Sequence, residues 1–387
     1  MRLLIVVSSL DLESGTGLAE RTYQIARRLA GRGVECAILT LDVGLGAERL
    51  RQLRGASIVA LPCIWRRFFL PAPGLRSMRA IVQSVKQADI VHLTGHWSVL
   101  NALVFPVLLH FSKPYVFSPG GTLAAAGRSL ALKRIYNALV GRALVRRASG
   151  WIAVTPGEFP EFRGYGIEPS SVTILPNGIE ACAPIAAEGS AAAKLAGKYA
   201  PYLLYVGRLH HVKGPDLLLR AFRDIATRFA DLKLVFVGPD DGLRPALEQA
   251  ASSSHLGERV AFLGYREGAE KDAAFRGAEL LVIPSRKEAM SLVALEAAIV
   301  GTPVLLTDQC GFDEISRIDP RLVAPATADG LARHLSELLQ DRSGLRRIGG
   351  ALKDYVAAHF GWDPVIGRYI ALLSSILETR SARSRNG

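Results

Sequence analysis

Short apolar segments alternate with amphipathic stretches along most of the chain, and this alternation constrains the fold more than any other feature. Segments such as 2–8, 202–206 and 280–283 are dominated by apolar residues, which is typical of strands buried on both faces of a parallel sheet. The intervening stretches have helical spacing of their apolar residues. With 387 residues the chain can form two such domains, each with its own core. The sequence therefore predicts two doubly wound α/β domains.

A basic loop joins an expected strand to an expected helix in segment 202–222, YLLYVGRLHHVKGPDLLLRAF. Gly207 ends the strand, Arg208 and Lys213 occupy the loop, and the helix opens after Gly214. The planar fork of an arginine and the point charge of a lysine suit a diphosphate. Taken alone, the segment also fits a solvated basic loop.

Two glutamates stand eight positions apart in segment 284–307, PSRKEAMSLVALEAAIVGTPVLLT. A loop after an apolar strand holds Glu288, and a helix beginning near Ser291 places Glu296 in its second turn. Free N–H groups and the helix dipole favour an anion at such a helix start. The alternative is an ordinary helix–strand unit with solvated glutamates. The functional interpretation is a nucleotide-sugar pocket in which the carboxylates hold hydroxyls and a diphosphate meets the N–H groups of Ser291, Leu292 and Val293.

Together the two segments resemble glycosyltransferase family 4, the group 1 glycosyltransferases, which are retaining enzymes of the two-domain GT-B fold. The matching pieces are G-R-L-x-x-x-K-G at 207–214 and E-x7-E at 288–296, followed by Gly-Thr-Pro-Val at 301–304. Similar segments extend the resemblance over almost the whole chain, at 89–100, 114–123 and 172–179. The resemblance implies a GT-B α/β fold, with two Rossmann-like domains facing a central cleft.

The resemblance also implies a role for each matching residue. Arg208 and Lys213 would neutralise the donor diphosphate and the charge that grows on it as the sugar leaves. Glu288 would hold hydroxyls of the donor sugar and complete the catalytic set, and Glu296 would hold the ribose. The transition state would be oxocarbenium-like, stabilised mainly by charge and positioning. The implied donor-binding set is Gly207, Arg208, Lys213, Glu288, Ser291, Leu292, Val293 and Glu296.

The N-terminal half contains the candidates for the acceptor side of the cleft. Gly15 and Gly17 lie between the first strand and the following helix, and His96 follows an expected strand at 89–93. Gly120 and Gly121 end the next strand, where their small size allows close approach of a sugar. A plain turn explains these two glycines equally well.

Two further features of this half stay open. The glycine loop at 15–17 lacks the third glycine of a dinucleotide fingerprint, since that position holds Glu20, and nicotinamide binding is therefore disfavoured. Many relatives carry H-x-H where this chain has His92-Leu93-Thr94. Either His92 or His96 is then a candidate for a cleft role, and a purely structural role fits both.

The domain organisation follows from these elements. Segment 181–198 has few order signals and is interpreted as a linker. Members of the family return to the first domain with a final helix. The expected parts are an N-terminal acceptor-binding domain at 1–180, a C-terminal donor-binding domain at 199–360, a final helix at 362–378 and a disordered tail at 379–387.

Positive charge is concentrated in the N-terminal half. Residues 1–185 carry 21 Lys and Arg against 11 Asp and Glu, whereas residues 186–387 carry 26 against 24. No nucleic-acid module is recognisable. Cations adjoin large apolar groups at 65–70 and recur along an expected helix at 129–147, a pattern that suits an anionic membrane surface. The alternative is a solvated helix face with an aromatic cluster in the core.

Other features restrict the compartment and the chemistry. The longest apolar run is too short to span a bilayer. Cysteines at 36, 63, 182 and 310 have neither disulfide nor metal spacing, as expected in a reducing cytoplasm. No D-x-D motif is present. We therefore expect no cofactor and a metal-independent reaction, in which Arg208 and Lys213 replace a cation.

The function that the sequence predicts is retaining transfer of a sugar from a nucleoside diphosphate donor to a saccharide or polyprenyl-linked acceptor. The context would be bacterial surface polysaccharide or glycolipid assembly, by a cytoplasmic protein held peripherally at the inner face of the cell membrane. Two alternatives remain. A nucleotide-sugar epimerase of the same fold would convert the donor without an acceptor. A non-catalytic partner subunit would bind donor or lipid only.

Overall fold

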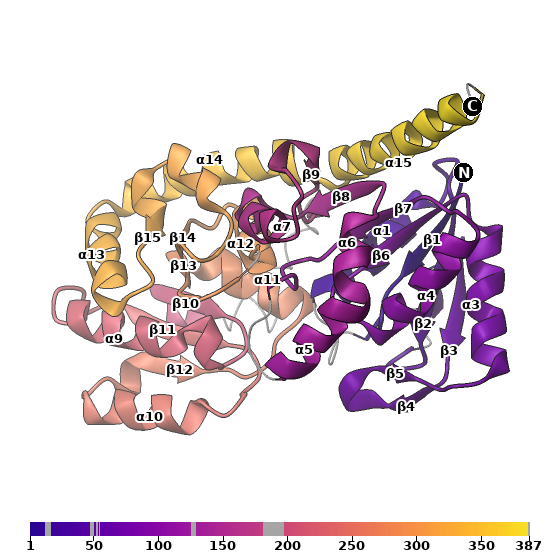
Figure 1. Ribbon diagram of the computed structural model, residues 1–387. Helices are drawn as coiled ribbons and strands as arrows, with labels where there is room; N and C mark the ends of the chain where they lie inside the picture. Colours follow the sequence, from indigo (N-terminus) through magenta and orange to yellow (C-terminus); the bar gives the residue numbers. More distant parts are fainter. Residues whose placement is uncertain are drawn as a thin grey trace. The chain divides into compact units, whose positions relative to one another are not determined.

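The chain folds into two compact units, Met1–Pro176 with Asp363–Gly387, and Asn177–Trp362 (Figure 1). The computed structural model describes residues 1–11, 17–46, 50–51, 53, 55–124, 129–180, 197–288 and 290–385. The first unit ends at Pro176, close to the expected limit at residue 180, whereas the second unit begins at Asn177 and not at the expected residue 199. Most of the expected linker and one candidate residue, Gly15, lie outside the described residues.

The first unit contains a parallel sheet in the order β3-β2-β1-β6-β7-β8-β9. Because the strand order reverses between β1 and β6, this unit has a topological switch point at their carboxyl ends. A separate antiparallel hairpin pairs β4 with β5. The strands are β1 Arg2–Val6, β2 Glu35–Leu41, β3 Ala56–Leu61, β4 Cys63–Trp65, β5 Leu70–Pro71, β6 Ile90–Thr94, β7 Tyr115–Ser118, β8 Gly150–Ala153 and β9 Val172–Ile174.

Both faces of this sheet are covered, because successive strand side chains point to opposite sides. On one face Val91 and Leu93 belong to a buried core that also contains Ile81 of α3. On the other face His92 reaches Tyr369 of α15. The helices of the unit are α1 Gly17–Leu29, α3 Leu75–Gln87, α4 Val99–His110, α5 Leu130–Tyr136, α6 Arg142–Arg146, α7 Phe159–Gly164 and, from Asp363 onward, α15 Trp362–Arg385.

The C-terminal helix corrects one expectation. Residues from Thr379 onward were expected to be disordered, but α15 is helical to Arg385. Its first turns are anchored by buried residues such as Ile366 and Tyr369. Once packing has nucleated a helix, adding each further residue costs little free energy. The Thr379 hydroxyl also donates a hydrogen bond to the Ser375 carbonyl at 2.8 Å. Polar composition alone was therefore misleading here.

The second unit repeats this architecture with a parallel sheet in the order β12-β11-β10-β13-β14-β15. Its switch point lies between β10 and β13, and the two doubly wound sheets confirm the predicted fold class. The strands are β10 Tyr202–Val206, β11 Lys233–Val237, β12 Val260–Phe262, β13 Leu280–Ile283, β14 Val304–Thr307 and β15 Val323–Ala324. The helices are α9 Pro215–Ile225, α10 Arg244–Ser253, α11 Gly268–Gly277, α12 Leu292–Ile299, α13 Ala328–Leu339 and α14 Arg342–Phe360.

The helix expected at 129–147 is divided into α5 and α6 by a π-helical turn at Asn137–Gly141. Such turns often occur at functional sites. Within the described part of the chain, none of the helices combines the length and the apolar character needed to cross a bilayer.

Candidate functional site

The basic loop and the glutamate loop of the second unit meet at its switch point. Gly207 directly follows β10, and its N–H donates to the Val237 carbonyl at 2.9 Å. Lys213 lies in the loop after β10, Glu288 lies in the loop after β13, and the Lys213 Nζ to Glu288 Oε1 distance is 2.9 Å. Both side chains are largely buried, with 27% and 15% of their areas exposed. The structure thus joins two motifs that stand 75 positions apart in the sequence.

Glu288 is held by two further contacts. The Ser285 hydroxyl donates to its second carboxylate oxygen at 3.0 Å, and the Glu288 N–H donates to the Gln309 carbonyl at 2.8 Å. One carboxylate oxygen therefore faces Lys213 while the other is fixed by Ser285. A carboxylate held in this way can accept hydrogen bonds from sugar hydroxyls.

An ion pair locks the two loops to each other. Arg286 donates to both carboxylate oxygens of Asp216, at 2.8 and 2.6 Å, and its N–H donates to the Val212 carbonyl at 2.8 Å. Burial alone would raise the pKa of Asp216, but hydrogen bonds from Arg286 and Arg220 lower it to about 2. Asp216 is therefore a carboxylate at neutral pH and keeps the loops together.

Gly214 allows the close approach of these loops. Its φ is +68°, in the left-handed region, and a Cβ atom would lie 2.0 Å from the Pro284 carbonyl oxygen. Neither the backbone conformation nor the space admits a side chain without movement of the glutamate loop.

The helix that was expected to begin near Ser291 is present as α12. Ser291 is the N-cap, and its hydroxyl accepts a hydrogen bond from the Ala294 N–H at 3.3 Å. The N–H groups of Leu292 and Val293 occupy the first two helical positions, where an α-helix offers no backbone acceptor. With the dipole, this helix start suits a phosphate oxygen.

Arg208 and Glu296 have other partners in this structure. Arg208 forms an ion pair with Asp241 in the loop after β11, at 2.9 Å, and its side chain is 61% exposed. Glu296 forms an ion pair with Lys271 of α11, at 2.8 Å. The predicted site thus has Lys213 and Glu288 in contact, whereas Arg208 and Glu296 engage neighbours that the sequence did not indicate.

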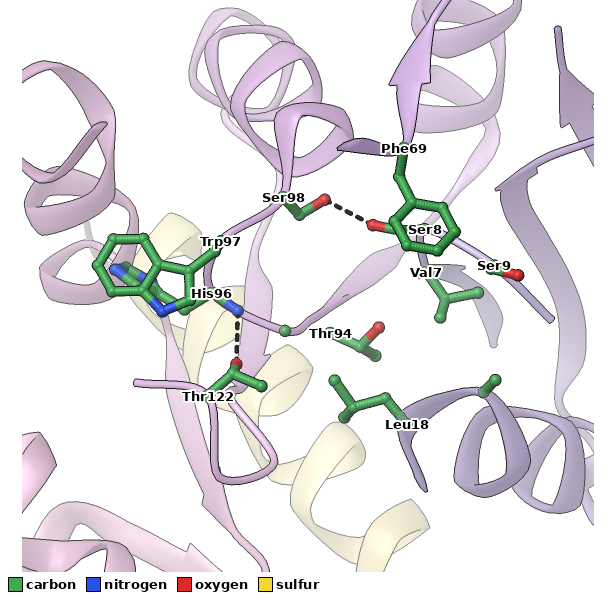
Figure 2. Close-up of a pocket in the computed structure, with 12 residues that line it drawn as sticks. Val7, Ser8, Ser9, Leu18, Phe69, Thr94, His96, Trp97, Ser98 and Thr122 are labelled. Carbon is green, nitrogen blue, oxygen red and sulfur yellow. Dashed lines mark hydrogen bonds between the residues drawn. The ribbon is translucent and has the colours of Figure 1, made fainter. Parts of the chain in front are cut away.

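The first unit has a cavity of about 160 Å³ at its own switch point. It lies at the ends of β1, β6 and β7 and is also bordered by α1 and by Phe69, which lies in the turn between β4 and β5 (Figure 2). Hydroxyl and aromatic groups form much of its lining, which comprises Val7, Ser8, Ser9, Leu18, Ala19, Phe69, Thr94, Gly95, His96, Trp97, Ser98 and Thr122. Of these residues only His96 was a candidate from the sequence, although several others lie directly after strand ends, where ligands bind in doubly wound sheets.

His96 is fully buried and takes part in a network with the π-helical turn. Its Nε2 lies 2.8 Å from the Asn137 side-chain oxygen and 3.0 Å from the Tyr165 hydroxyl. Among the described residues the buried Nδ1 of His96 and the buried indole N–H of Trp97 have no hydrogen-bond partner. Burial lowers the pKa of His96 to about 4, although the bond to Asn137 opposes this shift. The imidazole is therefore neutral at physiological pH.

His92 has a different environment. It lies inside β6, and its Nδ1 is 2.8 Å from the Tyr369 hydroxyl. Burial and the nearby Arg21 lower its pKa to about 3. It is absent from the cavity lining, so the geometry favours a structural role for His92 and leaves His96 as the histidine at the cavity.

The three candidate glycines that the structure describes differ in how they relate to the cavity. Gly17 begins α1, next to the lining residue Leu18. Gly120 has a φ of +55°, and a Cβ atom there would lie 2.4 Å from Leu18 Cδ2. The Gly121 N–H donates to the buried Glu158 carboxylate at 3.0 Å, which occupies this N–H within the protein.

Two family models match the chain. The model described as Glycosyl transferases group 1 matches residues 190–353, and the model described as Glycosyl transferase 4-like domain matches residues 16–178. Together they cover most of both halves of the chain, and the first range includes Lys213 and Glu288.

Curated relatives of the chain are also glycosyltransferases. A D-inositol 3-phosphate glycosyltransferase of Nocardia farcinica is 35% identical over 170 residues, covering 42% of the chain and 38% of the relative. A 2-deoxystreptamine glucosyltransferase of Streptomyces kanamyceticus is 26% identical over 394 residues, covering 92% and 97%. The chain spans less than half the length of the first curated relatives it matches.

Solved structures share the fold. Alr3699/HepE of Anabaena, in complex with UDP, has a TM-score of 0.79 at 18% identity and covers 97% of this chain and 100% of its own. Sucrose-phosphate synthase of Thermosynechococcus elongatus has a TM-score of 0.74 at 20% identity and covers 98% and 99%.

Proposed function

The chain belongs to the group 1 glycosyl transferases, and from this premise we propose that it transfers a sugar from a nucleoside diphosphate sugar to an acceptor hydroxyl with retained anomeric configuration. The acceptor would be a saccharide or a polyprenyl-linked saccharide. Structures of HepE that contain UDP or UDP-glucose support the donor class. The curated inositol phosphate and deoxystreptamine enzymes support a polyhydroxylated acceptor.

The observation that carries this proposal is the contact between Lys213 and Glu288 at the switch point of the second unit. A fixed cation and a fixed carboxylate there match the two needs of a nucleotide sugar, which are neutralisation of a diphosphate and recognition of hydroxyls. In the proposed reaction the Lys213 ammonium moves from Glu288 to the diphosphate as the donor binds. Glu288, still held by Ser285, then accepts hydrogen bonds from the donor sugar.

The remaining donor contacts follow from the same geometry. The N–H groups of Leu292 and Val293 would bind phosphate oxygens at the start of α12. Arg208 would exchange Asp241 for the diphosphate, and Glu296 would bind the ribose hydroxyls. Negative charge grows on the leaving diphosphate as the sugar becomes oxocarbenium-like, so these fixed charges would stabilise the transition state more than the bound donor. We propose that they do so without a metal ion.

The acceptor would bind in the cavity of the first unit, beside His96 and the glycines Gly17 and Gly120. The Nδ1 lone pair of His96 is suited to accept a hydrogen bond from an acceptor hydroxyl, because Nε2 is engaged by Asn137 and Tyr165. The biological setting that we propose is surface polysaccharide or glycolipid assembly in a bacterial cytoplasm, with the protein bound peripherally to the inner face of the cell membrane.

The first step of the test identifies the donor. Thermal unfolding is followed with UDP, GDP, ADP and their glucose conjugates, because a ligand at ~100 times its Kd stabilises the protein by ~2.7 kcal/mol. The stabilising donor is then incubated with monosaccharide, inositol and polyprenyl phosphate acceptors, and release of the nucleoside diphosphate is measured. Product with inverted configuration would contradict retention.

Variants test the residues. Lys213→Ala and Glu288→Gln should each lower the transfer rate by about 10²- to 10³-fold, whereas Lys353→Ala, an exposed change on α14, should leave it unchanged. Full activity in either site variant would show that the site is wrongly assigned. Donor conversion without any acceptor would identify an epimerase instead. Donor binding without consumption under every condition would identify a non-catalytic binding subunit.

A further inference from the structure

An unusual charge distribution lies in the first unit. Residues 49–157 contain fifteen Lys and Arg but a single acidic residue, Asp89. The excess of fourteen positive charges exceeds the net charge of +12 for the entire chain. Asp89 itself is paired with Arg2 at 3.4 Å. Such a segment repels cations and attracts any surface with dense negative charge.

Exposed apolar side chains occur within the same segment. One group lies on the β4–β5 hairpin and on α3, and a second group lies on α5 and the π-helical turn. We call these nine side chains the apolar rim: Ile64, Trp65, Phe68, Leu75, Met78, Leu130, Leu132, Ile135 and Leu139. Leu75 and Leu139 are 75% and 79% exposed, and α5 has no buried residue at all. The aromatic residues at 65–68, for which a core position was one alternative, are thus exposed.

Exposed cations accompany the apolar rim. Arg66, Arg76 and Arg79 adjoin its first group, and Arg134 and Arg142 adjoin its second. Among the residues described by the structure, none of these five guanidinium groups forms an ion pair. They are therefore available to an external anion.

Each group of the rim lies next to a residue that lines the cavity of the first unit or next to a residue in contact with one. Phe69, directly after Phe68, lines the cavity, and so does Trp97, on a different side of the lining in Figure 2. The Trp97 ring contacts Tyr136 of α5 at 5.6 Å, and the Lys133 ammonium lies 5.3 Å from that ring. In Figure 1 the β4–β5 hairpin and α5 both lie along the lower edge of this unit.

We propose that the apolar rim and its arginines dock on an anionic lipid bilayer, and that the cavity between them receives the head group of a lipid-carried acceptor from that surface. Leucine and tryptophan side chains would enter the headgroup region while the arginines contact lipid phosphates. A nucleic acid would match the charge but not the exposed leucines of α5. This inference assigns a surface to the membrane association in the proposed function, and it is tested without catalysis.

The test is vesicle flotation, with phosphatidylcholine vesicles that either contain or lack phosphatidylglycerol. The wild-type protein should float mainly with the anionic vesicles. Each Lys or Arg near such a surface contributes ~1 kcal/mol, or about fivefold in partitioning. The double variant Arg76→Glu/Arg134→Glu should therefore bind the anionic vesicles at least ~25-fold more weakly. The matched variant Arg333→Glu/Arg346→Glu, with the same charge change on exposed helices of the second unit, should bind like wild type.

A second pair of changes tests the apolar contribution. Leu132→Gln/Leu139→Gln removes two exposed leucines without removing charge, and it should weaken binding to anionic vesicles roughly tenfold or more. Retained stabilisation by the nucleoside diphosphate that stabilises the wild-type protein would show that a variant is folded and that the donor site is independent of the docking face. Equal flotation with both vesicle types, or equal losses in the rim and control variants, would overturn the proposal while leaving sugar transfer untouched.

Discussion

Acid should destabilise the first unit through two buried histidines. Folded His92 and His96 have pKa values of about 3 and about 4, below the ordinary value of 6.5, mainly because both are buried. Between these values and pH 6.5 the unfolded chain binds protons that the folded chain does not bind. The free energy of unfolding must therefore fall as the pH falls through this window.

The size of the effect follows from the same pKa values. From pH 7 to pH 5 each histidine is neutral in the folded state and becomes largely charged in the unfolded state, which costs about 2 kcal/mol per site and about 4 kcal/mol for both. Burial raises the pKa of Glu158, and its protonation in the folded state at lower pH offsets part of this loss. A loss of about 4 kcal/mol is a large share of the stability of a typical domain.

Urea unfolding at pH 7 and pH 5, followed by tryptophan fluorescence, measures this loss. Three of the four tryptophans, Trp65, Trp97 and Trp151, belong to the first unit, so the signal reports mainly on that unit. His92→Gln removes one of the two titrating groups, and its loss between pH 7 and pH 5 should be about half that of wild type. His110→Gln, at an exposed position, should keep the wild-type loss. Equal losses in wild type and His92→Gln would refute this reasoning.

Gly214 and Ser291, in the two loops of the proposed donor site, give further predictions. Gly214→Ala should destabilise the second unit by about 2–3 kcal/mol, since it combines left-handed strain with the contact to Pro284. Gly242 has a φ of +93° with open space at the Cβ position, so Gly242→Ala introduces only the backbone strain. It should lower the free energy of unfolding by about 1–2 kcal/mol. Chemical denaturation of both variants measures the difference between them. Ser291→Ala removes the cap of α12 and should lower the free energy of unfolding by about 1 kcal/mol while weakening stabilisation by the nucleoside diphosphate that binds the wild-type protein. An unchanged thermal shift with that nucleotide would show that this helix start does not contact the donor.

Local sequence signals determined most of the secondary structure around the site. The strands expected at 202–206 and 280–283 have these bounds in the structure, and the helix expected near Ser291 begins at Leu292. Apolar runs bounded by glycine or proline specify such strands almost without tertiary information, because both faces of a central parallel strand are buried. The two motifs could also be recognised from the sequence, because each is a short, contiguous segment.

Local sequence patterns gave wrong secondary-structure predictions where the conformation depends on long-range packing. The segment after Thr379 is polar but helical, because packing of earlier residues such as Tyr369 nucleates α15. The break between α5 and α6 was not predicted either. The π-helical turn there brings the Asn137 side chain to His96 and Tyr165, and those partners lie 41 and 28 positions away.

Two doubly wound domains and the residue types of the proposed phosphate and sugar site were predictable from sequence patterns. Which of those charged side chains contact each other was not predictable, because it depends on the tertiary structure. Lys213 pairs with Glu288 because β10 and β13 are neighbours at a switch point, whereas Arg208 and Glu296 find Asp241 and Lys271. Strand identity is a property of a few consecutive residues, but side-chain pairing depends on strand order, which is fixed by the packing of the whole unit.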